Sequence, residues 1–537
     1  MMFAAAAFLS LFAAPCLHAK ETDLSAQQGM GFYKDLFNDN IYYEFADYLN
    51  VETLYRKLTH KKIPAGNQNI YDEVPDSSFF TNRHARKRLT ADALEKGSLT
   101  SAGPDLSGSL TVISGESNEL HPRFFVRDGR GDIYLLKFDA QDSMELGTGA
   151  EVVGNRFYYA LGYNVAEASI ITLTPGQIVT GPKARYVAST GFTRSLTPSA
   201  LQDMLLFIPY NEAGKLRASA MKVLEGVVKG PFGLRGHQRK EPGDAVAHEN
   251  LREIRALRIF TSWLNHYDLR SGHTVRTVVE KNGQREFKNY LLDASSSLGS
   301  GYYDAKPPMF TFENAFDYGE VSKAFFAMGL WEKPWQKQWR EVKEKTGSPA
   351  FGYFENRHFN SGTFKTQLPG RAFKNLTRAD GFWAAKIIMT FKDDDIRSIV
   401  KAAAYSHPED AERITKTLSE RRDKIGRYWF SKANPLDAFD RSGGKLVFTD
   451  LAVDYGFESA EGTVYRVEVT GHKRNKKHTI ASVESREPSV TIDPAWFAAD
   501  EKADLVIRIL RPSSKKPGPY VTVGLSRDGL LSITHQD

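Results

Sequence analysis

The stretch NHYDLRSGHTVRTVVEKNGQREFKNYLLD, residues 265–293, combines a polar loop, a hairpin pattern and two aspartates. Asp268 lies in the loop before the hairpin, and Asp293 follows the second strand. An Asn-Gly pair at 282–283 predicts the turn, because this pair favours the positive backbone angles of a two-residue hairpin loop. The sequence therefore places an acid at each end of one hairpin, with His273 close behind the first acid.

Strand patterns come before this stretch and helix patterns come after it. The runs RFFVRD and IYLLKFD alternate apolar and polar residues around an Asp-Gly turn, which predicts another hairpin. The run TGAEVVGNRFYYALGY predicts a helix that Thr148 opens and Gly162 closes. From residue 248 apolar residues recur at helical spacing, and beyond residue 443 short alternating strands return.

This order predicts an α+β chain with a strand-rich lobe, a helix-rich lobe and a small C-terminal β-domain. A chain of 537 residues is expected to form about two to four domains. The predicted boundaries are a signal peptide at 1–19, an N-terminal extension at 20–104, a strand-rich lobe at 105–235, a helix-rich lobe at 236–440 and a β-sandwich-like domain at 443–537.

The first residues of the chain predict export. An apolar run from Phe3 to Ala14 precedes Pro15, and Ala19 is a small residue that suits signal-peptide cleavage. The single cysteine, Cys16, follows proline, so cleavage near Ala19 is favoured over a lipid anchor on Cys16. No later apolar run approaches the ~20 residues that cross a bilayer. We therefore expect a soluble protein of the periplasm or the extracellular space.

Overall charge argues against nucleic-acid binding. The 71 basic and 65 acidic residues leave a net charge of +6, which is a small excess for this length. Two basic runs exist, RHARKR at 83–88 and HKRNKKH at 472–478. The second run lies between alternating segments, so it is expected at the solvated tip of a hairpin.

A lysine and a glutamate are placed to meet across a cleft. Lys137 lies on the predicted strand IYLLKFD, and Glu151 lies in the first turn of the helix that follows. Phosphoryl transfer needs a cation for the nucleotide phosphates, an acid that orients this cation, acids that hold metal and an acid that accepts the hydroxyl proton. A structural alternative stays open, because Thr148 and Glu151 match a capping box in which the glutamate only caps its own helix.

Five stretches together resemble atypical protein-kinase-like families. They are DEVPDSSFFTNR at 72–83, GTGAEVVGNRFYYALGYNVAE at 147–167, NHYDLRSGHT at 265–274, LLDASSSLGSG at 291–301 and ERRDKIGRYW at 420–429. The chain resembles the HipA-like and spore-coat CotH-like kinases, and most closely exported bacterial kinase-like proteins related to them. The resemblance covers about residues 70–435. It implies a two-lobed protein-kinase-like fold, with the C-terminal β-sandwich-like domain outside it.

The resemblance also implies roles for five residues. Lys137 corresponds to the phosphate-binding lysine, with Glu151 as its ion-pair partner. Asp268 corresponds to the base that accepts the substrate proton, and Arg270 to the basic residue that contacts the transferred phosphate. Asp293 corresponds to the metal-binding acid that follows the hairpin.

Two positions depart from the kinase pattern. His273 stands where the D-x-K-x-x-N loop has its metal-binding asparagine, and Ala294 and Ser295 follow Asp293 where Phe and Gly are usual. Neutral histidine binds metals but prefers softer ions than Mg²⁺. His273 is therefore a second predicted metal ligand, and the expected cofactors are ATP or another nucleotide with Mn²⁺ or Mg²⁺.

Two functions of different classes follow from these residues. The first is an exported phosphotransferase that moves phosphate from a nucleotide to a hydroxyl of a protein or glycan. The second is a catalytically inactive pseudokinase that acts as an exported binding or scaffold protein. Adenylyl transfer by the same fold also stays open.

Other catalytic motifs are weaker. S-x-x-K at 219–222 and K-T-G at 345–347 are two marks of penicillin-recognising serine enzymes, but SAMK lies in a predicted strand, whereas such a serine must begin a helix. His248 and Glu249 lack the second histidine of a zinc protease, and there is no glycine-rich dinucleotide or P-loop motif.

Overall fold

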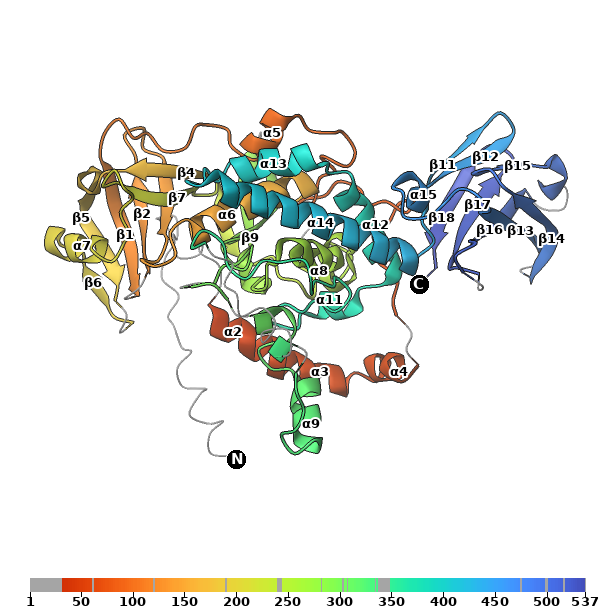
Figure 1. Ribbon diagram of the computed structural model, residues 1–537, viewed down its shortest axis with the longest axis horizontal. Coiled ribbons are helices and arrows are strands. Elements are labelled where there is room, and N and C mark those ends of the chain that lie inside the picture. Colours follow the sequence, from red (N-terminus) through yellow and green to blue (C-terminus); the bar gives the residue numbers. More distant parts are fainter. Residues whose placement is uncertain are drawn as a thin grey trace.

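The computed structural model describes residues 31–59, 62–118, 121–188, 191–238, 244–281, 283–301, 304–306, 308–333, 335–336, 348–473, 476–497, 501–514 and 517–536. The predicted signal peptide, with Cys16, and the K-T-G motif lie outside these residues. Along its longest axis the molecule has a large sheet at one end, helices in the middle and a β-domain at the other end (Figure 1). The predicted mixed α and β chain is confirmed.

The large sheet has seven strands in the order β4-β7-β3-β2-β1-β5-β6. Every neighbouring pair is antiparallel except β1 and β5, which are parallel. The strands are β1 (Leu110–Asn118), β2 (His121–Arg127), β3 (Ile133–Phe138), β4 (Ala168–Leu173), β5 (Ile178–Val187), β6 (Thr193–Ser195) and β7 (Leu216–Lys222). The strand that carries Lys137 therefore lies inside the sheet, between β2 and β7.

Alternation along β3 decides which way Lys137 points. Tyr134 and Leu136 pack on one face of the sheet in a core that includes helix α7 (Pro198–Leu205). Leu135 packs on the opposite face, against Val275 of the hairpin. Because side chains of a strand alternate between faces, Lys137 shares the face of Leu135 and looks toward the helical part.

Helix α6 (Leu146–Leu161) follows β3 and begins two residues before the predicted start. Thr148 was expected to cap this helix, and that prediction is wrong. Its hydroxyl and backbone N–H donate to the Asp139 carboxylate at 2.6 and 2.8 Å. Asp139 therefore satisfies the first helical amides from outside the helix, and Thr148 lies within its first turn. The end at Gly162, whose φ is 123°, agrees with the prediction.

The middle part is helical and contains the hairpin of the opening stretch. Its main helices are α5 (Ala91–Lys96), α8 (Arg252–Leu264), α11 (Arg371–Asn375), α12 (Arg378–Met389), α13 (Asp393–Lys401) and α14 (Pro408–Lys432). The hairpin strands β9 (Thr274–Lys281) and β10 (Gln284–Leu291) pair as predicted, and β8 (Val227–Gly230) joins them on the other edge of β9. Asn282 of the turn lies outside the described residues, and Gly283 has a φ of 74°.

The turn between α13 and α14 is hydrogen-bonded to the large sheet and to the residue before α6. Arg217 of β7 donates hydrogen bonds to the backbone carbonyls of Ala403 and Ala404, between α13 and α14. Ser406 of the same turn donates to the Glu145 carboxylate, just before α6. We call this set of contacts the latch, because it ties the sheet to the helices next to α6.

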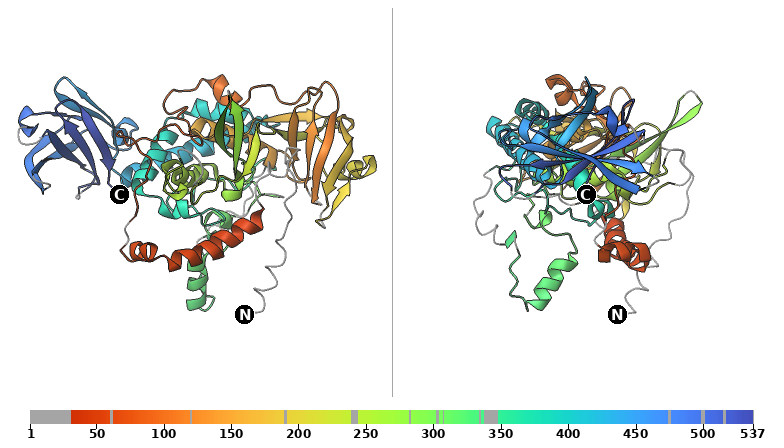
Figure 2. Two further views of the ribbon diagram at one scale, coloured as in Figure 1. Left: turned by 180° about the vertical axis from the view of Figure 1, so that it is seen from behind. Right: turned by 90° about the vertical axis from the view of Figure 1, so that its right-hand side faces the viewer.

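An N-terminal helical segment lies outside the two lobes. It comprises α2 (Phe32–Phe37), a π-helical turn (Asn38–Tyr42), α3 (Tyr43–Leu49) and α4 (Val51–Thr59). The segment runs along the helical part, and helix α9 (Tyr318–Phe326) projects from the same side (Figures 1 and 2). None of the described helices is both long and apolar enough to cross a membrane.

The C-terminal domain consists of two antiparallel sheets around one apolar core. Its strands are β11 (Leu436–Ser442), β12 (Lys445–Asp450), β13 (Val464–Lys473), β14 (Lys476–Ser485), β15 (Ser489–Thr491), β16 (Lys502–Leu510), β17 (Tyr520–Ser526) and β18 (Leu530–His535), with a short helix α15 (Leu451–Asp454). The basic run at 472–478 spans the β13–β14 turn, as predicted, although residues 474–475 are outside the described part. The buried His535 ring contacts Asp72 at 2.7 Å and joins this domain to the chain before the sheet.

Candidate functional site

Lys137 meets two carboxylates that come from different parts of the chain. Its Nζ atom lies 2.8 Å from Glu151 Oε2 on α6 and 3.1 Å from Asp293 Oδ1, just after β10. The second Glu151 oxygen accepts a hydrogen bond from the Ala294 N–H at 3.2 Å. Glu151 therefore bridges the lysine and the segment after the hairpin, and it does not form the capping box that was the structural alternative.

Lys137 and Asp293 hold each other in the ionised form, whereas burial, opposed by Lys137 and aided by Asp293, raises the pKa of Glu151. Burial alone lowers the pKa of Lys137, but the carboxylates of Asp293 and Glu151 outweigh it and raise the pKa above its usual value. Burial raises the pKa of Asp293, but the nearby charges, with Lys137 the largest, and the Ser295 hydrogen bond together outweigh it and hold the pKa well below the usual range. One ammonium group thus faces two acids, which leaves room for a further positive charge.

Asp293 has an uncommon backbone conformation. Its φ is 57°, in the left-handed region, and Leu298 five residues later has a φ of 54°. Aspartate tolerates this region, but a branched residue such as leucine is strained there. Non-glycine residues in such conformations cluster at functional sites. The segment after the hairpin is therefore held in a strained shape that fixes the position of Asp293.

The loop before the hairpin forms the second half of the site. Asp268 Oδ1 is buried, accepts no hydrogen bond among the described residues, and lies 3.5 Å from Arg270 Nε. Its other oxygen lies 4.0 Å from His273 Nε2. Burial raises the pKa of Asp268 to about 7, with Arg270 opposing the shift and Asp293 adding to it. The loop therefore presents an acid that changes its protonation near neutral pH.

His273 is buried and neutral. Burial and the nearby Arg270 lower its pKa to about 3, and its Nδ1 atom has no hydrogen-bond partner among the described residues. Its backbone carbonyl accepts from the Leu292 N–H at 2.8 Å, which ties the loop to the residue before Asp293. All six predicted site residues therefore lie in one region, in two groups.

The donor atoms present fit a metal that shares its ligands with a nucleotide. Asp293 supplies a carboxylate, and Asp268 Oδ1 and His273 Nδ1 are potential metal-ligand atoms that have no hydrogen-bond partner among the described residues. Within the described ranges no group of three or more His, Cys, Asp or Glu side chains is arranged to hold a metal by itself. Mg²⁺ commonly binds through one or two carboxylates, with water and substrate phosphates as the remaining ligands.

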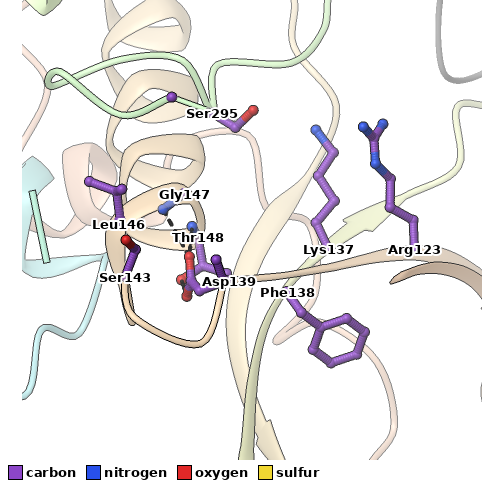
Figure 3. A pocket seen from close by; sticks show the side chains of 11 residues that line it. Arg123, Lys137, Phe138, Asp139, Ser143, Leu146, Gly147, Thr148 and Ser295 are labelled. Atoms are coloured by element: carbon purple, nitrogen blue, oxygen red, sulfur yellow. Dashed lines mark hydrogen bonds between the residues drawn. The ribbon is translucent and has the colours of Figure 1, made fainter. Parts of the chain in front are cut away.

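A pocket opens beside Lys137. It has an empty volume of about 510 Å³, which includes the open solvent of its mouth. Arg123 of β2 and Lys137 project side by side from neighbouring strands, with Asp139 at the start of α6 and Ser295 across from them (Figure 3). The pocket thus places two cations beside the helix start.

Two residues of the site were missed in the sequence. His266 accepts or donates a 2.7 Å hydrogen bond with the Tyr158 hydroxyl of α6, and burial lowers the pKa of this histidine to about 4. A signal for His266 was present, because H-x-D-L at 266–269 matches the kinase loop H-R-D-L. Asp35 also reaches this loop from the N-terminal segment, and nothing local in the sequence indicates that contact.

The rival motifs have structural roles. Ser219 is buried within β7, where it pairs with Lys137 of β3 and Ile170 of β4, so it does not begin a helix. His248 stacks on Phe232 at 3.8 Å between ring centroids and bonds to Asp244. Neither arrangement provides a nucleophile or a zinc site.

Comparisons with known proteins give weak likenesses. No family model matches the chain, and no curated protein matches it. The crystal structure of a Helicobacter pylori proinflammatory kinase, CtkA, is similar with 11% identity and a TM-score of 0.27, over 59% of this chain and 98% of that chain. The crystal structure of the Golgi casein kinase is similar with 7% identity and a TM-score of 0.29, over 78% of this chain and 93% of that chain. At TM-scores this low, neither likeness assigns a fold or a function to this chain.

Proposed function

We propose that this protein is an exported, metal-dependent phosphotransferase with a protein-kinase-like cleft. One observation carries the proposal: Lys137 contacts both Glu151 and Asp293 at 2.8 and 3.1 Å. Kinases need this arrangement, in which a lysine on the third strand pairs with a glutamate of the following helix while an acid after the catalytic loop holds metal. Here the lysine strand, the helix, the loop and the acid also follow in that order.

The remaining residues suit the steps of transfer. Lys137 and Arg123 face the pocket, where they would hold nucleotide phosphates. Asp268, with a pKa of about 7, is matched to accept a hydroxyl proton near neutral pH. Arg270 beside it would contact the transferred phosphate. A metal held by Asp293 and His273 would neutralise phosphate charge, and its identity, Mn²⁺ or Mg²⁺, is part of the proposal along with ATP or another nucleotide.

The acceptor that we propose is a hydroxyl of a protein or glycan, since the sequence of residues 1–19 favours export from the cytoplasm. The alternative is a pseudokinase that binds partners without turnover. One observation favours this alternative: the buried, neutral His273 replaces the asparagine that kinases use as a metal ligand.

Nucleotide binding tests the proposal first. We expect ATP with Mn²⁺ or Mg²⁺ to stabilise chain 20–537 against heat, by about 2.7 kcal/mol at one hundred times the dissociation constant. Asp293→Ala should lose the metal-dependent part of this shift. Asp142→Asn, at an exposed acid near the pocket, is the matched control and should keep the full shift.

Transfer of a labelled terminal phosphate to the chain itself or to a mixed protein substrate separates the two functions. We expect Asp268→Asn to bind nucleotide normally and to lose at least a hundredfold in transfer rate. Binding without transfer in the wild-type protein would establish the pseudokinase. No thermal shift with any nucleotide and metal would rule out the kinase-like function.

A further inference from the structure

The segment from Phe32 to Leu49 is attached with its polar side inward. Its buried side chains are Asp35, Asn40 and Asp47. Six of its large apolar side chains are exposed, between 54% and 83% of their area, whereas Phe32, Leu36 and Tyr43 are half-buried. The exposed six are Tyr33, Phe37, Ile41, Tyr42, Phe45 and Leu49. An ordinary surface helix buries its apolar stripe. We call this segment the strap, since its fully buried side chains among the described residues are polar and none of them is apolar.

Ion pairs hold the far end of the strap. Asp47 contacts Arg235 at 2.8 Å and also pairs with Arg371. Glu44 pairs with Lys374, and the Arg235 guanidinium lies 4.4 Å from the centroid of the Tyr43 ring. The Glu44–Lys374 pair is partly exposed, whereas Asp47 is buried between its two arginines, and salt weakens such contacts where solvent reaches them. The strap is therefore held by contacts that can be released without unfolding the lobes.

The near end of the strap reaches the candidate catalytic loop. One oxygen of Asp35, Oδ2, accepts hydrogen bonds from Arg270 Nη1 at 2.6 Å and from the Gly272 N–H at 2.8 Å. Asp35 is only 1% exposed. A guanidinium and a backbone amide that converge on one anionic oxygen form the pattern with which proteins bind phosphate.

The contact between Asp35 and Arg270 would oppose the proposed reaction. Arg270 is the residue expected to contact the transferred phosphate, and Asp35 now takes one of its nitrogens. The Asp35 carboxylate and a phosphate oxygen are both acceptors, so they compete for the same two donors. Burial raises the pKa of Asp35 despite Arg270, which shows that its charged form is less favoured here than in water.

We propose that Arg270 and the Gly272 amide form a phosphate site and that Asp35 occupies it as an internal substitute, so that the strap inhibits the enzyme until it detaches. This inference rests on the proposed function, whose site it regulates. Detachment loses little buried apolar area and mainly breaks ion pairs, so it is compatible with intact lobes. The strap also contacts α9, where the Tyr318 hydroxyl donates to the Asn40 carbonyl at 2.9 Å.

Two variants of chain 20–537 release the strap from its opposite ends. Asp35→Asn removes the internal anion, and Asp47→Asn removes two ion pairs without touching the loop. Inorganic phosphate at low ionic strength is the probe, measured by calorimetry. We expect both variants to bind phosphate at least tenfold more tightly than the wild type, with faster amide hydrogen exchange in residues 32–49. Tyr33→Ser, at a residue 83% exposed on the same helix, should change neither measurement.

The result that overturns the strap is unchanged or weaker phosphate binding in both variants, because Asp35 would then only support the loop. Phosphate affinity does not depend on turnover, so this test is separable from the proposed function. If the variants bind phosphate tenfold more tightly but the protein transfers no phosphate, Asp35 does occupy a phosphate site, and the proposed kinase activity is wrong. If the wild type transfers phosphate and neither Asp35→Asn nor Asp47→Asn accelerates the transfer, the kinase activity stands and inhibition by the strap is wrong.

Discussion

The two halves of the cleft differ in how far their charges are satisfied. On the sheet side, Lys137 pairs with Glu151 and Asp293, and each of these acids has a further hydrogen bond from the neighbouring loop. On the loop side, Asp268 and His273 each have a buried atom without a hydrogen-bond partner among the described residues. Buried polar atoms left unsatisfied cost stability, so they persist where function requires them. The charges of the sheet half are therefore paired, whereas the loop half keeps buried polar atoms that a ligand would satisfy under the proposed function.

The largest effect is expected when Lys137 is replaced, because the charges of the sheet half then lose their shared partner. Lys137→Met leaves two buried carboxylates facing each other, and loss of one partner of a buried ion pair costs about 3–5 kcal/mol. The pKa values of both acids then rise above their unfolded values, so the defect grows as pH rises above about 4 and acid relieves it. Urea unfolding at pH 5 and pH 8 measures both effects.

The matched control is Lys215→Met, at an exposed lysine near the start of β7. Its stability should stay within about 0.5 kcal/mol of the wild type at both pH values. Equal losses for the two variants would contradict a special role of the Lys137 cluster.

A second comparison uses one acid from each half. Asp293→Asn should lose about 2 kcal/mol of stability at pH 8, because it removes a charge paired with Lys137. Asp268→Asn should be as stable as the wild type or more stable, because it removes a buried acid that resists ionisation.

The sign of the Asp268 effect follows from its pKa, which is raised to about 7 in the folded chain from an ordinary value of 3.8. Wild-type stability is lost as pH rises from about 4 through about 7, and the asparagine variant lacks this loss. The variant should therefore gain on the wild type over this window, as seen in urea midpoints at pH 4, 6 and 8. A constant difference across these pH values would contradict the raised pKa.

The smallest expected effect concerns the hydrogen bond that joins the halves. Tyr158→Phe removes the partner of the buried His266 ring, at a cost of about 1–2 kcal/mol in unfolding free energy. Tyr159→Phe is the control. The Arg83 guanidinium lies 4.4 Å from the centroid of the Tyr159 ring, and a phenylalanine ring at this position keeps that contact. If the two variants are equally stable, the bond between Tyr158 and His266 contributes nothing.

The sequence was informative where the contacts are local or follow from alternation. Lys137 on a strand and Glu151 on the next helix could be paired because strand and helix periods fix where their side chains point. The alternative, in which Glu151 forms a capping box with Thr148, was equally consistent with the sequence. It failed because Asp139, nine residues before Thr148, satisfies the helix start instead.

Contacts between distant segments were not predictable in this way. Asp35 meets Arg270 across more than two hundred residues, and an acid in a helical pattern gives no indication of its partner. The orientation of the strap was also not predictable. Apolar side chains of a surface helix are expected to be buried, whereas six of those in the strap are exposed. His266 was readable from the H-x-D-L motif, but its partner Tyr158 required the packing of α6 on the loop.

The latch has a consequence for kinetics. Arg217 and Glu145 hold the turn at 403–406 by hydrogen bonds from both sides, next to the helix that carries Glu151. A tilt of the sheet away from the helices would stretch these bonds. Under the proposed function, we therefore expect Ser406→Ala to ease this tilt and to shorten the residence time of a nucleotide without changing the chemistry.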